Sequence, residues 1–192
     1  YELNISWWSA MEDSSRDAKR FQYERFILSQ LLVMALKGVP AFYLPALLAS
    51  ENDIKSFSMT GQRRDLNREK FKSENLLAVL NNPESNANKN LKYLRNAMDV
   101  RSELKQFHPC SEMKCLSKGR SDIVVIKRGK GPESVFAIHN MTENKINYQL
   151  NDNDLPKIID NDFNTHDFLT STKYNCKNIS LDPFQVIWLS AL

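Results

Sequence analysis

The chain has 192 residues, with 26 Lys and Arg against 23 Asp and Glu, which gives a net charge of +3. That excess is small and scattered, whereas a nucleic-acid-binding protein carries a strong and clustered one, so we expect no nucleic-acid partner. Hydrophobic residues make up 42% and charged residues 26%, which is typical of a globular chain of one or two domains. No run of 18 apolar residues occurs, so no transmembrane helix and no membrane partner are expected.

The three cysteines, Cys110, Cys115 and Cys176, are an odd and sparse set. A secreted disulfide framework uses an even and dense set, so we predict free thiols and a cytoplasmic protein. His108 and Cys110 with Cys115 lack a second pair of ligands at zinc spacing, so no metal site is expected. The N-x-[ST] triplets at Asn4, Asn140 and Asn178 are expected by chance in a chain so rich in Asn.

The first predicted element is a helix over residues 15–36, where Phe21, Leu28, Leu32 and Ala35 share one face. Gly38 and Pro40 end it. Residues 41–44 are apolar and lie between two prolines, which predicts a fully buried strand of a parallel sheet. Residues 50–72 are polar and show little periodicity, which predicts a long loop that is either functional or disordered. Two helices follow, over residues 73–80 and 88–107.

The hydrophobic period changes from residue 122 onward, where alternation favours strands. Residues 123–127 and 134–139 are predicted to form a hairpin, and residues 146–150, 179–181 and 184–189 are predicted to form further short strands. The fold class is therefore α/β plus all-β, with residues 1–107 as the α/β part and residues 108–192 as a small antiparallel β-sandwich.

The segment Gly61-Gln62-Arg63-Arg64-Asp65-Leu66-Asn67-Arg68 holds three arginines, one carboxylate and two amides. Arginine side chains can bind hydroxyls, carboxylates or phosphate through two parallel hydrogen bonds. The alternative is a solvated loop that pairs its own charges, and composition alone leaves both open. The segment follows a predicted buried strand, where α/β enzymes place their chemistry, and this favours the functional interpretation. Trp7 and Trp8 could stack on sugar rings, although packing in a core or interface is the simpler expectation.

Several of these segments resemble one family in order. Lys37-Gly38-Val39-Pro40-Ala41-Phe42-Tyr43 resembles the turn before the eighth barrel strand in glycoside hydrolase family 13, the α-amylase family. Leu47 to Asp53 and Thr60 to Lys70 resemble its sucrose phosphorylase subfamily, as does the amino-terminal Tyr1-Glu2-Leu3-Asn4. Phe136 to Thr142 and Phe184 to Leu189 are similar to its carboxy-terminal β-domain.

The resemblance implies an enzyme built on a (β/α)8 barrel that transfers glucosyl groups with retention of configuration. An Asp attacks the anomeric carbon, a Glu protonates the leaving oxygen, and phosphate then releases α-glucose 1-phosphate. The substrate would be an α-glucoside such as sucrose, sucrose 6'-phosphate or glucosylglycerate, with inorganic phosphate as co-substrate and no cofactor. Arg64 would bind glucose in the donor subsite and pair with an Asp from an early barrel strand. Asp65 would also belong to the substrate-binding residues, and Tyr1 and Glu2 would shape the acceptor and phosphate site. Glu2 favours the glucosylglycerate or sucrose-phosphate members over sucrose.

By the same resemblance, residues 1–107 form the last quarter of the barrel and no catalytic residue lies in this chain. Because one parallel strand cannot close a barrel, we expect the chain to need the preceding part of the barrel as its partner and to be inactive alone. The first residue, Tyr1 rather than Met, also indicates a fragment or a processed chain. Two alternatives stay open, a hydrolase or amylase-like enzyme of the same family and a stand-alone carbohydrate-binding β-domain.

Overall fold

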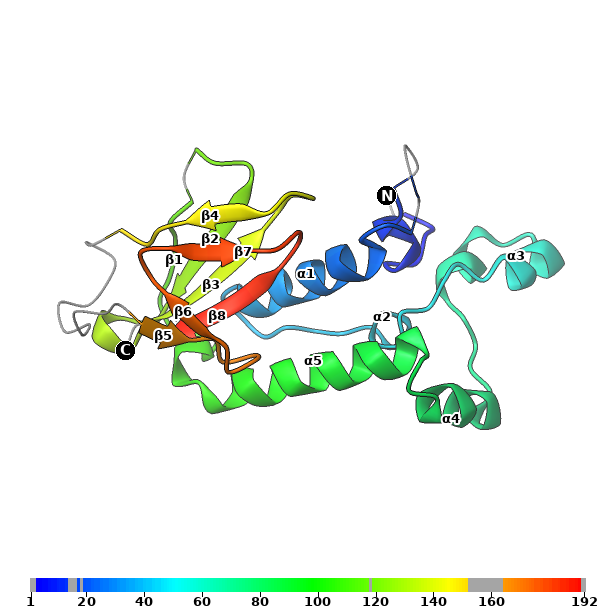
Figure 1. Cartoon of the computed structure of the whole chain (residues 1–192). Helices are drawn as coiled ribbons and strands as arrows, with labels where there is room; N and C mark the ends of the chain where they lie inside the picture. The colour runs from blue at the N-terminus through cyan, green and yellow to red at the C-terminus, as the bar shows by residue number, and fades with distance from the viewer. Residues whose placement is uncertain (1–2, 14–16, 18, 118, 152–163, 191–192) are drawn as a thin grey trace. The chain divides into compact units, whose positions relative to one another are not determined.

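The computed structural model describes residues 3–13, 17, 19–117, 119–151 and 164–190. It divides into two compact units (Figure 1). The first unit comprises Tyr1–Ile27 and Ala41–Arg95, and the second comprises Leu28–Pro40 and Asn96–Leu192. Two helices, α1 (Gln22–Ala35) and α5 (Asn86–Glu103), contribute residues to both units. No helix among the described residues is long and apolar enough to cross a membrane.

Helix α1 confirms the first predicted helix, but it begins at Gln22 rather than near residue 15. Phe21, directly before it, has φ 57°, a left-handed conformation that an L-residue cannot hold inside a helix. The predicted start at residues 14–16 lies outside the described residues. Gly38, three residues after the helix ends, has φ 115°, as expected for the glycine of the turn that stops it.

The buried strand predicted at residues 41–44 is wrong. Residues 41–43 form no strand, and α2 (Leu44–Leu47) begins directly after them with Pro45 in its first turn. Tyr43 is 56% and Leu44 50% exposed, and no described strand pairs with this segment. A strand is stable only where a neighbour completes its hydrogen bonds, whereas a proline early in a helix costs nothing because its missing N–H would have no partner there.

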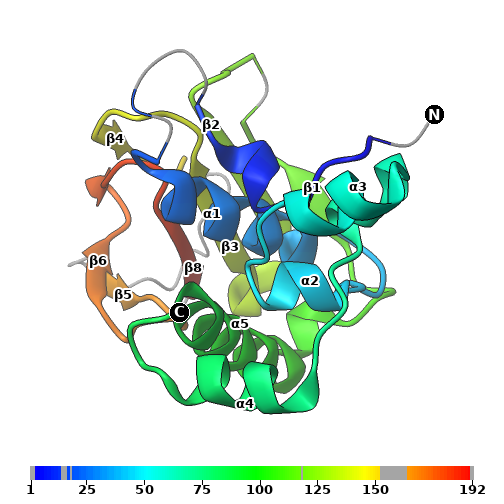
Figure 2. The ribbon, with the colours of Figure 1, turned by 90° about the vertical axis from the view of Figure 1, so that its right-hand side faces the viewer.

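The polar segment is also more regular than a loop. It forms α3 (Ile54–Thr60) and the 3-10 helix η2 (Arg63–Asn67), and it is followed by α4 (Ser73–Asn81) and α5 (Figure 2). Helices α4 and α5 confirm the two predicted helices, and a short 3-10 helix, η3 (Lys105–Phe107), extends the second to the predicted end.

The first unit is held by a small aromatic core beside η1 (Ser9–Met11). Trp8 is 3% exposed, and its ring lies edge-on to Phe26, with the ring centres 5.2 Å apart. Ala46 and Ala49 of the α2 region complete this core. Packing is therefore the role of Trp8, whereas Trp7 is 41% exposed.

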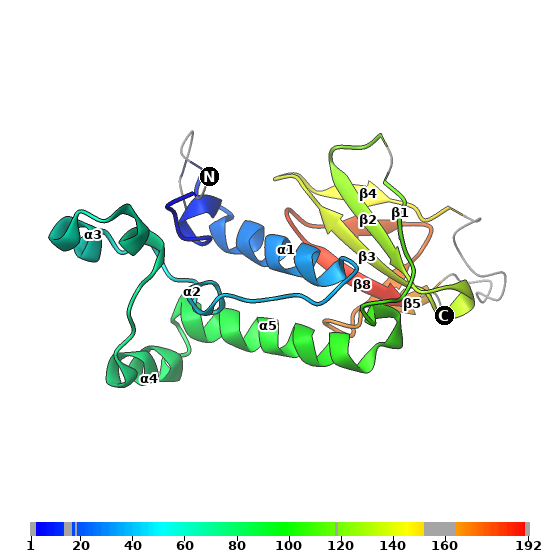
Figure 3. The same ribbon diagram turned by 180° about the vertical axis from the view of Figure 1, so that it is seen from behind.

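The second unit is rich in antiparallel sheet, as predicted (Figures 1 and 3). Its four-stranded sheet has the order β1-β2-β3-β8, from β1 (Met113–Cys115), β2 (Ile123–Arg128), β3 (Val135–Asn140) and β8 (Val186–Ser190). The predicted hairpin is β2 with β3, joined through η4 (Gly131–Glu133). Two-stranded sheets pair β4 (Ile146–Tyr148) with β7 (Ile179–Leu181) and β5 (Asn164–His166) with β6 (Lys173–Asn175).

The four-stranded sheet and the β4–β7 sheet share one hydrophobic core. Ile138 of β3 lies opposite Val125 of β2 and Ile187 of β8, and all three are fully buried. Ile179 and Leu181 of β7 belong to the same cluster and are fully buried too. The short strand predicted at residues 179–181 is therefore confirmed as β7, with Ile179 and Leu181 on its inward side. Cys110, Cys115 and Cys176 are free thiols, as expected.

Candidate functional site

The arginine-rich segment of the first unit is ordered by a cap at the start of α3. The Asp53 carboxylate accepts hydrogen bonds from the Ser56 N–H at 2.9 Å and from the Ser56 hydroxyl at 2.5 Å. These bonds hold the pKa of Asp53 below its usual value, because they stabilise its charged form. The Asp53 N–H in turn donates to the Leu66 carbonyl at 2.8 Å. The cap therefore ties the start of α3 directly to η2.

A tight turn reverses the chain between α3 and η2. Gly61 has φ 67° and its N–H donates to the Phe57 carbonyl at 2.8 Å, which is the left-handed helix end that favours glycine. The Thr60 hydroxyl donates to the Asp65 carboxylate at 2.6 Å, and the Gln62 N–H donates to the same hydroxyl at 3.1 Å. Asp65 is thus oriented by the turn that precedes it.

The predicted site residues Arg64 and Asp65 both lie in η2. Arg63, Arg64 and Arg68 are exposed, and Asp65 is half-buried. Such an arrangement presents guanidinium groups to solvent from a backbone that is fixed at both ends, by Asp53 and by Thr60. It can bind hydroxyls or anions, which are the partners that arginine recognises through paired hydrogen bonds.

The amino-terminal segment is bonded to the beginning of this region through Asn52. The Asn52 side-chain oxygen accepts from the Ser6 N–H at 2.7 Å, and the Asn52 N–H donates to the Ser9 hydroxyl at 3.1 Å. Ser6 and Ser9 are therefore bonded to the residue directly before the α3 cap. Tyr1 and Glu2, the predicted acceptor-side residues, lie outside the described residues, so their role stays a prediction.

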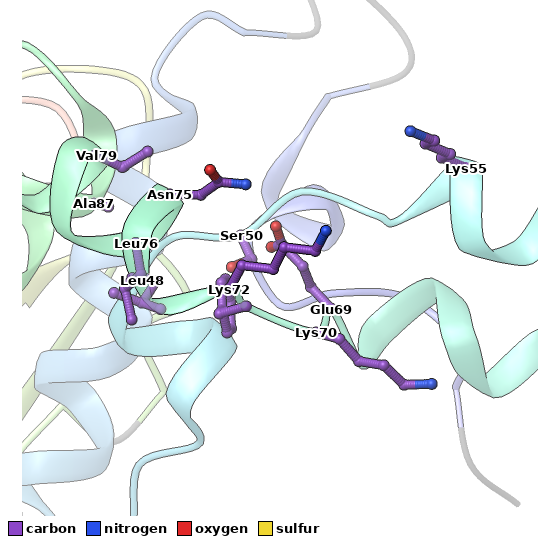
Figure 4. Close-up of a pocket in the computed structure, with 11 residues that line it drawn as sticks. Leu48, Ser50, Lys55, Glu69, Lys70, Lys72, Asn75, Leu76, Val79 and Ala87 are labelled. Atoms are coloured by element: carbon purple, nitrogen blue, oxygen red, sulfur yellow. The ribbon is translucent and has the colours of Figure 1, made fainter.

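A cavity of about 380 Å³ lies beside this region in the first unit (Figure 4). Leu48 and Leu76 lie close together in it, whereas Lys55 and Lys70 project away from them. Arg64 and Asp65 do not line it. The lining residues come from the end of α2, from α3, from residues 69–72, from α4 and from the start of α5: Leu48, Ser50, Lys55, Glu69, Lys70, Phe71, Lys72, Asn75, Leu76, Val79 and Ala87.

No metal centre is found within the described part of the chain, where no three His, Cys, Asp or Glu side chains gather at ligand distance. The cap that Asp53 forms at the start of α3 was missed from the sequence, although Asn52-Asp53 before an apolar helix is a recognisable cap signal.

Comparison with known proteins places this geometry in context. No protein-family model matches the chain. The chain is 31% identical over 144 residues to a glucosylglycerate phosphorylase of Allomeiothermus silvanus. The aligned region covers 74% of this chain and 26% of that protein. The chain is 23% identical over 190 residues to a glucosylglycerate phosphorylase of Escherichia coli, covering 98% and 32%. A sucrose phosphorylase of Streptococcus mutans is 24% identical over 80% of the chain. The chain thus spans about a quarter to a third of the length of these relatives.

Several solved structures have a similar fold. AmyP, solved in complex with maltotriose, aligns with a TM-score of 0.69 at 14% identity and covers 88% of this chain and 35% of its own. A trehalose-6-phosphate hydrolase of Bacillus licheniformis aligns with a TM-score of 0.63 at 16% identity, covering 95% and 41%. At such identities the likeness shows the fold alone.

Proposed function

We propose that the chain is the carboxy-terminal part of an α-glucoside phosphorylase. The proposal follows from the resemblance of this chain to the sucrose phosphorylase subfamily of glycoside hydrolase family 13, which these similarities confirm. The intact enzyme would transfer a glucosyl group from glucosylglycerate, sucrose 6'-phosphate or sucrose to phosphate, in the cytoplasm and without a cofactor. The observation that carries this proposal is the similarity to glucosylglycerate phosphorylase over 98% of the chain.

Within that enzyme, residues 1–107 would complete a (β/α)8 barrel and residues 108–192 would form its β-sandwich domain. Arg64 would donate hydrogen bonds to the hydroxyls of the glucosyl group, and Asp65, held by Thr60, would keep that guanidinium in place. Tyr1 and Glu2 would line the acceptor and phosphate site. The nucleophilic Asp and the acid Glu would come from the preceding part of the barrel, so this chain would be inactive alone.

Substrate and product analysis tests the reaction. The intact enzyme is incubated with each of the three glucosides, with and without inorganic phosphate, and glucose 1-phosphate and free glucose are measured. We expect phosphate-dependent glucose 1-phosphate, highest with glucosylglycerate. Release of free glucose at the same rate without phosphate would instead support a hydrolase of the same family, the alternative that the resemblance leaves open. Turnover by the 192-residue chain alone would refute the assignment of catalytic residues.

A matched pair of variants tests the role of Arg64. Arg64→Ala should lower kcat/KM by about 100- to 1,000-fold, because two charge-assisted hydrogen bonds to the substrate contribute about 3–4 kcal/mol. Arg63→Ala removes the same charge from the neighbouring exposed position of η2 and should change kcat/KM by less than about threefold. Equal losses in both variants would mean that the segment acts only through its net charge.

A further inference from the structure

Two adjacent residues, Asn52 and Asp53, hold two distant segments of the first unit. Asn52 accepts from the Ser6 N–H through its side-chain oxygen at 2.7 Å, and its own N–H donates to the Ser9 hydroxyl at 3.1 Å. Asp53 donates from its N–H to the Leu66 carbonyl of η2 at 2.8 Å. The amino-terminal segment and η2 are therefore both bonded to one dipeptide.

The bond from Ser6 to Asn52 satisfies a buried group. Ser6 is 4% exposed, so its N–H cannot simply turn to water when a protein acceptor is removed. The Ser6 hydroxyl accepts from the Ser9 N–H at 3.1 Å, and the Ser6 carbonyl accepts from the Ala10 N–H at 3.0 Å. The chain that enters η1 is therefore built on Ser6, and its orientation depends on the bond to Asn52.

The aromatic core supplies a second contact between the same two parts of the chain. Trp8 packs there with Ala46 and Ala49, and Ala49 precedes Asn52 by three positions. Hydrophobic packing is non-directional, whereas a hydrogen bond fixes an orientation. Loss of the Asn52 side chain should therefore leave the two parts in contact and release the orientation of Ser6.

We infer that Asn52 is a positioning residue for the acceptor and phosphate side of the intact enzyme. The inference rests on the proposed function, in which Tyr1 and Glu2 line that side and Arg64 of η2 binds the glucosyl group. Only three residues separate Glu2 from Ser6, so a change in the orientation of Ser6 passes to Glu2 through a short stretch of chain. Asn52 acts on phosphate binding through Ser6 and not by direct contact.

Steady-state kinetics of the intact enzyme test this role. Asn52→Ala should raise KM for phosphate about tenfold, because a hydrogen bond that orients the acceptor side is lost, and should change kcat by less than about threefold. Asn52→Asp keeps an oxygen that accepts from the Ser6 N–H and should restore KM to within about threefold of the wild type. The matched control is Asn82→Ala, which removes the acceptor of the Glu84 N–H in the same unit and should leave KM unchanged.

Ser9→Ala provides a second variant, which decides the test if Asn52→Ala loses the wild-type circular dichroism spectrum. It removes the hydroxyl that accepts from the Asn52 N–H and should raise KM for phosphate about fivefold.

Two results would overturn the role of Asn52 and leave the proposed function standing. One is a KM for phosphate within about twofold of the wild type in both Asn52→Ala and Ser9→Ala. The other is an equal rise of KM in Asn52→Ala and Asn52→Asp, because the acceptor oxygen would then not be what matters. A wild-type enzyme that forms no glucose 1-phosphate from phosphate would refute the proposed function and the role of Asn52 together.

Discussion

Arg128 should contribute more to the stability of the second unit than any surface charge near it. Its side chain is fully buried at the end of β2. Its guanidinium donates to the carbonyls of Ala35 at 2.9 Å, Leu36 at 2.7 Å and His108 at 3.0 Å. The first two carbonyls end helix α1, where the helix dipole carries partial negative charge, so a cation is favourable there.

The cost of Arg128→Met follows from these three bonds. Each carbonyl left without a partner away from water costs about 1–3 kcal/mol. The bond to Ala35 is buried and those to Leu36 and His108 are partly buried, so the three sum to at most about 9 kcal/mol and to less where water reaches the last two. The variant also no longer buries a charge, a gain of several kcal/mol that offsets part of the loss. Burial lowers the pKa of Arg128, and the charge of Arg101 adds to the effect, because both disfavour the charged form. We therefore expect a net loss of about 3 kcal/mol.

Urea unfolding followed by the β-sheet signal in circular dichroism measures this loss. Lys130→Met makes the same change in the same hairpin, at a side chain that is 79% exposed and whose ammonium lies 3.0 Å from the Glu112 carboxylate. It should change the free energy of unfolding by less than about 1 kcal/mol. A value for Arg128→Met within 1 kcal/mol of the wild type would refute the argument, because the three carbonyls would then be satisfied without the guanidinium.

Two other substitutions test the two units separately. Burial lowers the pKa of His139 from 6.5 to about 4. As the pH falls, the unfolded chain therefore takes up a proton at this histidine before the folded chain does, and stability is lost between pH 6.5 and about pH 4. His139→Gln should remove about 3 kcal/mol of that pH dependence, measured as unfolding free energies at pH 7 and pH 4; identical pH profiles would contradict it. In the first unit, Asn52→Ala removes the acceptor of the Ser6 N–H and should speed hydrogen exchange at that amide about tenfold. Asn82→Ala, which removes the acceptor of the Glu84 N–H instead, should leave Ser6 unchanged.

Local patterns predicted the elements whose sequence signal is local. Two runs typical of strands, residues 123–127 and 134–139, predicted the antiparallel hairpin that β2 and β3 form. The beginning of α1 was placed too early because the sequence gives no sign that Phe21 adopts a positive φ. Such a conformation at a bulky residue is set by its surroundings, which a periodicity analysis does not include.

The predicted strand at residues 41–44 shows a different limit. Its apolar residues between Pro40 and Pro45 predicted a fully buried segment, and this was wrong, because Tyr43 and Leu44 are half exposed. A parallel strand takes its stability from neighbours on both sides, and the described residues supply none. The pattern therefore described a requirement for partners, whereas the helix α2 is what local preferences form without them.

The site was predictable in its residue types but not in its connections. Arginines in a turn-rich segment pointed to Arg64 and Asp65, and the structure adds the hydroxyl of Thr60 that orients Asp65. The Ser6 to Asn52 bond joins residues 46 positions apart, and no short-range pattern encodes such a pair. The family resemblance, rather than local chemistry, is the basis for the prediction that both segments belong to one site.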